Sequence, residues 1–210
     1  MVMRLAARPS VCLPGPNPPG ILFPVVSRDE ILTPLSVEEY LEREKRSDVR
    51  HEFIEGYVYS MVGASRRHNL IALSIERMLH AALRGTPCRA FVSDLKVQVG
   101  ERFFYPDVVV SCSGSLDEHI EREPKLIVEV LSPSTEARDR MEKRLAYQSL
   151  ASLEEYVLVA QDRVHVEVYR RGGPAWVVER YEAGDTARLE SVGTSFATEQ
   201  IYEDVLDGPE

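Results

Sequence analysis

The chain has 210 residues, of which 44% are hydrophobic and 28% charged, and its formal net charge is −9. These values describe an ordinary globular protein with room for one sizeable core. The acidic balance disfavours a protein that coats nucleic acid by charge alone. No apolar run reaches the length of a membrane span, about 18 residues, and the first residues lack the apolar core of a secretory signal. We therefore expect a cytoplasmic protein without a membrane partner.

Three cysteines, Cys12, Cys88 and Cys112, lie far apart in the sequence and show no CxxC spacing. An odd and scattered set argues against a disulfide framework and against a thiolate metal site.

The first 34 residues hold seven of the 13 prolines. Proline at this density interrupts both helices and sheet ladders. We expect a Pro-rich N-terminal tail over residues 1–34, a single domain over residues 35–205 and a short C-terminal tail over residues 206–210.

The domain begins with a predicted helix over Val37–Lys45. Ser36 is a natural N-cap, and Glu39 three residues later completes a capping box. The pair Glu55-Gly56 then predicts a tight turn between two short strands.

A longer helix is predicted from a cap at Ser65 to about Leu83, because apolar residues recur there at helical spacing. Two strands that pair with each other, Phe91–Val99 and Phe103–Val110, follow it. Lys125–Leu131 is a compact apolar run, which is typical of a buried central strand.

The second half of the domain continues with a helix over Thr135–Ser149 and a strand over Glu155–Ala160. The remaining predicted elements are an antiparallel extension over Val164–Arg170, Trp176–Glu182 and Ala187–Leu189, and a last helix over Thr198–Val205. From Ser65 to Ala160, the predicted elements follow the order αβββαβ. It predicts an α/β fold of the mixed-sheet, α+β kind, in which helices cover most of the sheet.

Two acidic residues lie in apolar strands: Asp107 within FFYPDVVV and Glu129 within LIVEVL. A carboxylate is costly to bury unless it is paired or binds a metal. Either residue alone could be an inward acid satisfied by an arginine or by the backbone. Two such acids on neighbouring strands instead suggest a shared divalent cation, and Mg²⁺, or Mn²⁺ in its place, is held by a few carboxylates plus water and phosphate.

A lysine is the third group that phosphate chemistry at such a metal site could use, because an ammonium near the attacking water stabilises the hydroxide and the charge that develops on the phosphate. Leu131 stands on the same strand face as Glu129, at the position where a Glu-x-Lys motif would place it. Lys143 is the best substitute, although its spacing from Asp139 alone favours a solvated helix lysine that pairs with this aspartate. Two other lysines remain competitors: Lys96 and Lys125.

Several short motifs follow one another in a fixed order. They are Arg50-His51-Glu52, Glu55-Gly56, Arg67-His68-Asn69, Pro106-Asp107, the run from Glu129 to Thr135, Asp139 with Lys143 and Tyr147, and Glu155-Tyr156-Val157-Leu158. This series resembles the Uma-two family of restriction endonucleases, which belongs to the PD-(D/E)XK nuclease superfamily. The resemblance covers about Leu35–Val205.

The resemblance implies a restriction-endonuclease-like fold and a metal-dependent phosphodiesterase. Asp107 and Glu129 match the two metal-binding acids, and Lys143 matches a downstream position that could take over the role of the displaced lysine. Glu52 resembles an additional ligand or water-orienting acid, and His68 could be an acid/base group or a phosphate contact. Without the resemblance, Glu52 reads equally as a surface residue at a strand start and His68 as a capping or packing residue.

The leading hypothesis is a Mg²⁺-dependent endonuclease acting on DNA. A second is a nuclease-like fold that binds nucleic acid or a protein partner without cutting, which the leucine at position 131 and the acidic net charge favour. A third is hydrolysis of another phosphodiester, such as RNA. Double-strand cleavage with one site per chain would suit a two-fold homodimer.

Overall fold

The computed structural model of the chain describes residues 34–61, 63–114, 117–173, 175–203 and 205. Except for Pro34, the predicted N-terminal tail lies outside the described residues, as does the predicted C-terminal tail at 206–210. Among the helices that the structure describes, none combines the length and apolar character needed to cross a membrane.

The first elements agree with the sequence. Helix α1 (Val37–Glu44) begins with the expected capping box of Ser36 and Glu39. Strands β1 (His51–Ile54) and β2 (Tyr57–Ser60) pair as an antiparallel hairpin. The turn needs glycine at position 56, because its φ is +89° and a Cβ there would lie 2.4 Å from the Cβ of Pro34.

Strand β8 (Pro124–Leu131) lies inside a mixed sheet that contains six strands within the described residues, in the order β11-β10-β9-β8-β6-β3. It runs parallel to β9 and antiparallel to β6. The bounds of its neighbours are β3 Arg89–Val92, β6 Val108–Ser111, β9 Glu155–Ala160, β10 His165–Gly172 and β11 Ala175–Glu182. The predicted mixed α/β class is confirmed.

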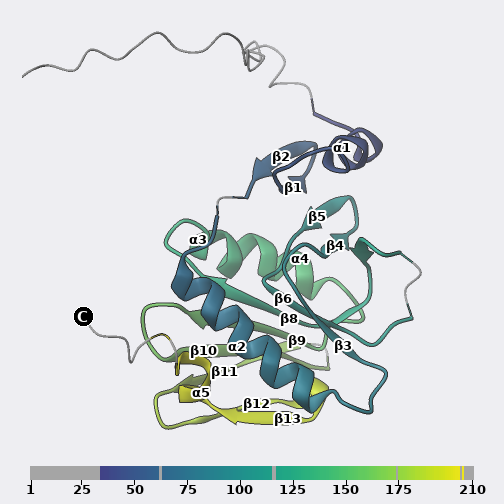
Figure 1. Cartoon of the computed structure of the whole chain (residues 1–210). Coiled ribbons are helices and arrows are strands. Elements are labelled where there is room, and N and C mark those ends of the chain that lie inside the picture. Colours follow the sequence, from purple (N-terminus) through teal and green to yellow (C-terminus); the bar gives the residue numbers. More distant parts are fainter. Residues whose placement is uncertain (1–33, 62, 115–116, 174, 204, 206–210) are drawn as a thin grey trace, which may run out of the picture. The chain divides into compact units, whose positions relative to one another are not determined.

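Helices cover both faces of this sheet (Figure 1). Helix α2 (Arg66–Ala82) packs over one face, against Val128 and Val130 of β8. The other face lies under a continuous helix made of α3 (Glu136–Arg138), a π-helical segment η2 (Asp139–Lys143) and α4 (Arg144–Gln148). Because strand side chains alternate, Glu129 points to this second face.

The prediction of two continuous strands over Phe91–Val99 and Phe103–Val110 is wrong. Each is broken into two shorter strands that belong to different sheets. The second sheet has the order β2-β1-β5-β4-β7 within the described residues, with β4 at Lys96–Val99, β5 at Arg102–Phe104 and β7 at Ile120–Glu121.

The break has a local cause in the backbone. Ser93 and Asp94 have φ of +48° and +54°, a conformation that stops a strand. The returning chain breaks opposite them, since Ser93 N–H donates to the carbonyl of Asp107. Asp107 is therefore held at the junction of the two sheets instead of within a continuous strand.

The C-terminal part differs from the expected extension in one respect. Strands β10 and β11 extend the central sheet as predicted, but β12 (Thr186–Leu189) pairs with β13 (Thr194–Ala197) in a separate two-stranded sheet. Strand β13 and the short 3₁₀ turn η3 (Glu190–Val192) were not foreseen. Helix α5 (Thr198–Tyr202) is the predicted last helix.

The expectation of no disulfide is wrong, because Cys88 and Cys112 are bonded. Antiparallel pairing of β3 with β6 sets Arg89 opposite Ser111, so the next residues outward, Cys88 and Cys112, face each other. Their separation of 24 residues in sequence hides a contact that strand register creates.

We predict that replacing Cys88 and Cys112 with alanine lowers the free energy of unfolding by about 3 kcal/mol, because the bond restricts the unfolded chain. Urea unfolding under oxidising conditions measures the loss. Cys12→Ala is the control and should behave as the wild type. A wild-type protein whose stability does not change on reduction would contradict the assignment.

Candidate active site

A cleft of about 440 Å³ opens where β8 passes the N-terminus of α2. Its lining includes all five residues singled out from the sequence: Glu52, His68, Asp107, Glu129 and Lys143. They come from β1, α2, the junction between β5 and β6, β8 and η2. Tertiary structure thus gathers residues that span 91 positions, from 52 to 143, into one cavity.

Glu129 is buried, and its side chain is held by two donors from the covering helix. Lys143 Nζ donates to Glu129 Oε1 at 3.2 Å, and Tyr147 Oη donates to the same oxygen at 3.3 Å. A carboxylate enclosed in this way keeps a fixed orientation, because its partners belong to one rigid helix.

Lys143 is also buried, with a side-chain exposure of 6%, so the solvated alternative for this lysine is wrong. Besides Glu129, its Nζ lies 2.9 Å from Glu52 Oε1 and 3.3 Å from Asp139 Oδ1. These two oxygens accept no hydrogen bond of good geometry, although both are buried. The ammonium is therefore enclosed by three carboxylates but satisfies only one of them well.

The two competing lysines lie elsewhere. Lys96 Nζ donates to Tyr105 Oη at 3.3 Å, and Lys125 Nζ pairs with Glu154 Oε1 at 2.6 Å. Of the three lysines considered from the sequence, the one beside Glu129 is Lys143.

Asp107 is fixed by the backbone of the neighbouring strand. The amide of Val130, the residue after Glu129, donates to Asp107 Oδ2 at 2.6 Å. His68 Nε2 lies 3.2 Å from the same oxygen. The carboxylates of Asp107 and Glu129 therefore reach the cleft from adjacent positions, and His68 stands beside the first of them.

Acidic side chains crowd the surroundings of Glu129. Burial and the nearby carboxylates of Asp139, Asp107 and Glu52 hold the pKa of Glu129 well above its ordinary value, although Lys143 opposes this. Burial also raises the pKa of Asp139. Lys143 responds in the opposite sense: burial lowers its pKa, but the surrounding carboxylates outweigh burial and raise it well above the ordinary value. Four carboxylates thus share too few cations, and a bound cation would relieve the repulsion.

The donor set suits a magnesium site made of two protein carboxylates. Mg²⁺ is usually held by one or two carboxylates together with water and substrate phosphate. Asp107 and Glu129 could provide the two carboxylates. Within the described part of the chain, no three His, Cys, Asp or Glu side chains form a ready-made metal cage. The residues therefore fit a hydrated, substrate-completed Mg²⁺ site and do not fit a closed structural one.

Arg138 is a further cleft residue, and no sequence pattern singled it out. Its Nη1 lies 3.4 Å from Glu52 Oε2, and its guanidinium lies 4.4 Å from the ring centre of Tyr59 on β2. Glu52 is itself buried, so the reading of this residue as a surface glutamate is wrong. A one-third-exposed arginine at the mouth of an acidic cleft is a candidate contact for phosphate.

We predict that the pKa of His68 lies above its ordinary value of about 6.5. Burial alone would lower this pKa, but the ion pair with Asp107 outweighs burial. The pairing therefore stabilises the fold below the unfolded pKa, and this contribution is lost as pH rises through the folded pKa. Titration of the imidazole by NMR measures it, and Asp107→Asn should lower the midpoint. A midpoint unaffected by this substitution would refute the pairing.

Comparison with known proteins places these features in a family. Residues 37–199 match the family described as Uma2, "Putative restriction endonuclease". Two uncharacterized proteins of Synechocystis sp. are similar in sequence. The protein slr1290 is 37% identical over 173 residues, covering 80% of this chain and 91% of the relative. The protein sll1609 is 32% identical over 173 residues, covering 79% and 96%.

A solved structure from Anabaena variabilis, described as "a putative nuclease belonging to DUF820", has the same fold. It superposes with a TM-score of 0.67 at 18% identity and covers 81% of this chain and 98% of its own. The match over residues 37–199 includes every cleft residue described above, and the chain belongs to the Uma2 family.

Proposed function

We propose that this protein is a metal-dependent endonuclease that hydrolyses phosphodiester bonds in DNA. The observation that carries the proposal is the convergence of Asp107 and Glu129 on one cleft with a buried lysine beside them. A nuclease needs acids to hold a metal and a cation close to the attacking water, and this cleft offers both.

Asp107 and Glu129 would hold Mg²⁺, with Mn²⁺ as a substitute. A bound Mg²⁺ would supply positive charge for the scissile phosphate and an activated water. Glu52 Oε1 lies 2.9 Å from Lys143 Nζ, which also contacts Glu129, and Glu52 would act as an additional metal ligand or orient a water.

Lys143 would stabilise negative charge on the attacking water and on the phosphate, as an ammonium fixed in advance by its carboxylate partners. Its raised pKa favours the charged form that this role requires. His68, when protonated beside Asp107, could give a proton to the leaving oxygen or contact the phosphate.

DNA is favoured as substrate because the family to which the chain belongs is described as restriction endonucleases. A homodimer in the cytoplasm would place two such clefts on the two strands of a duplex. RNA is the competing substrate, and cleavage assays with matched DNA and RNA duplexes separate the two.

A non-cutting nucleic-acid or protein binder is the second candidate. The observation in its favour is that Leu131 replaces the strand lysine and is packed into the core under α4. The two candidates differ in whether the cleft binds metal and whether Lys143 matters for turnover.

We predict that Mg²⁺ or Mn²⁺ binding displaces a proton, because the pKa of Glu129 is raised and the metal competes with that proton. Affinity should therefore rise with pH. Calorimetry in buffers of different ionisation enthalpy measures the proton release. Glu129→Gln should abolish both binding and release, whereas metal binding that survives Glu129→Gln and Asp107→Asn would rule out this site.

We predict that Asp107→Asn and Glu129→Gln each reduce Mg²⁺-dependent DNA cleavage to background. Lys143→Met should reduce kcat by at least about 100-fold, the usual effect of removing one preorganised charge-stabilising group. Lys125→Met is the matched control, since Lys125 is also ion-paired with a glutamate but lies outside the cleft.

Circular dichroism would establish that each variant is folded before rates are compared. A wild type that neither cleaves DNA or RNA nor binds Mg²⁺ or Mn²⁺ in a manner that depends on Asp107 would favour the non-cutting binder instead.

A further inference from the structure

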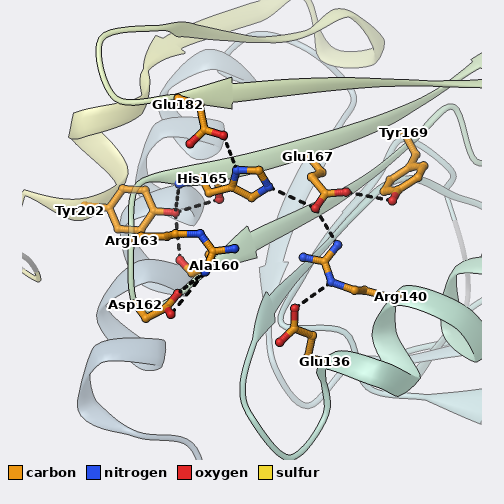
Figure 2. Close-up of polar contacts among 10 residues, drawn as sticks. All are labelled: Glu136, Arg140, Ala160, Asp162, Arg163, His165, Glu167, Tyr169, Glu182 and Tyr202. Atoms are coloured by element: carbon orange, nitrogen blue, oxygen red, sulfur yellow. Dashed lines mark hydrogen bonds and ion pairs between the residues drawn. The ribbon is translucent and has the colours of Figure 1, made fainter.

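Figure 2 shows a second group of ion pairs and hydrogen bonds, which joins Arg140 on the helix over this face to residues of β10 and β11. None of the residues drawn lines the cleft. Arg140 Nη1 donates to Glu167 Oε1 on β10 at 2.6 Å. Glu167 Oε2 accepts a hydrogen bond from Tyr169 Oη at 2.9 Å, and His165 Nε2 lies 3.1 Å from Glu167 Oε1. On its other side, His165 Nδ1 lies 2.8 Å from Glu182 Oε1.

Arg140 belongs to the π-helical segment η2, between Asp139 and the cleft residue Lys143. Lys143 contacts both Glu129 and Asp139, while Arg140 contacts Glu167 on β10. A π-helical turn holds one residue more than an α-helical turn and is less stable, so it persists where other contacts fix it.

Side chains bind the backbone of this turn as well. Tyr156 Oη, buried on β9, donates to the carbonyl of Asp139 at 3.0 Å. Arg144 Nε donates to the carbonyl of Arg140 at 2.8 Å. Two consecutive carbonyls of the π-helical turn thus accept bonds from side chains, which compensates for the altered helical hydrogen bonds.

Glu167, the partner of Arg140 on β10, is held by several hydrogen bonds. Glu167 is buried, with 5% exposure, and a buried carboxylate is costly without partners. Burial opposes its charge, yet the hydrogen bonds from Arg140, His165 and Tyr169 outweigh burial and hold the pKa of Glu167 below its ordinary value. Glu136 Oε1, at 2.8 Å from Arg140 Nε, fixes the same guanidinium from the preceding turn.

We propose that Arg140 and Glu167 form a positioning pair, which holds the π-helical turn against the sheet so that Lys143 meets Glu129. Neither residue lines the cleft. The pair acts by fixing the rotation of one helical turn, and a displacement of about 1 Å at a reacting group can cost about 100-fold in rate. The effect on turnover rests on the proposed nuclease function, whereas the effect on the position of Lys143 does not.

The position of Lys143 can be followed directly, because the chain has only four lysines: Lys45, Lys96, Lys125 and Lys143. With ¹³C,¹⁵N-lysine labelling, NMR at one fixed pH would give four side-chain signals, and Lys143→Arg assigns the one from the cleft. In Arg140→Met and in Glu167→Gln we expect the Lys143 signal to shift or broaden while the other three stay in place. Arg140→Lys keeps the charge at Glu167 and should leave the Lys143 signal near its wild-type position, beside a fifth signal from the introduced lysine.

Glu179→Gln is the matched control. It breaks the 2.8 Å pair between Glu179 on β11 and Arg170 on β10, which lies in the same sheet but does not reach η2. It should leave the Lys143 signal unchanged. A folded Arg140→Met or Glu167→Gln protein with an unmoved Lys143 signal would overturn the proposal, as would an equal change in Glu179→Gln. If Arg140→Met does not fold, Glu167→Gln and Arg140→Lys decide by the same signal.

Cleavage kinetics provide the second readout. In Arg140→Met and Glu167→Gln we expect kcat to fall about 10- to 100-fold with KM unchanged, because the pair lies outside the substrate cleft. A rise in KM with kcat unchanged would argue against positioning of Lys143. If the wild type cleaves no nucleic acid, the proposed function fails, while the NMR signal still tests the positioning pair.

Discussion

The contact between the Lys143 ammonium and the Glu129 carboxylate is the interaction on which the rest of the site depends. Each charged side chain alone would cost several kcal/mol to bury, and the ion pair offsets part of that cost for both. Glu52 and Asp139 crowd the same ammonium, so the cluster carries more negative than positive charge. That imbalance is the physical basis for our proposal that the cleft binds a divalent cation.

The position of Asp107 relative to this cluster follows from the bend between the two sheets. If β5 and β6 were one straight strand, Asp107 would be an ordinary ladder residue. Because the chain breaks before β6, its carboxylate turns to accept from the amide of Val130, immediately after Glu129. Backbone geometry therefore sets the spacing of the two acids, and His68 at the start of α2 adds a titratable group beside them.

A lysine on a helix needs a different structural restraint from a lysine on a strand. A strand lysine at position 131 would be fixed by the ladder that also fixes Glu129. Lys143 is fixed only through the helix that carries it, and that helix contains a π-helical turn at the critical position. The bonds from Tyr156 and the pair of Arg140 with Glu167 supply the restraint that the ladder would have given.

Local patterns in the sequence were sufficient for the caps at Ser36 and Ser65, the hairpin at Gly56, the buried strand β8 and the two acids in apolar surroundings, because each depends on neighbours within a few residues. The strand break at Ser93 and Asp94, the Cys88–Cys112 bond, the burial of Lys143 and the anchoring of Arg140 depend on partners that are 14 to 91 residues away, or on strand register. Spacing on a helix could show only that Lys143 and Asp139 share a side. Tertiary structure decided that this side faces Glu129, since the packing of the helix on the sheet, rather than its own sequence, sets its rotation.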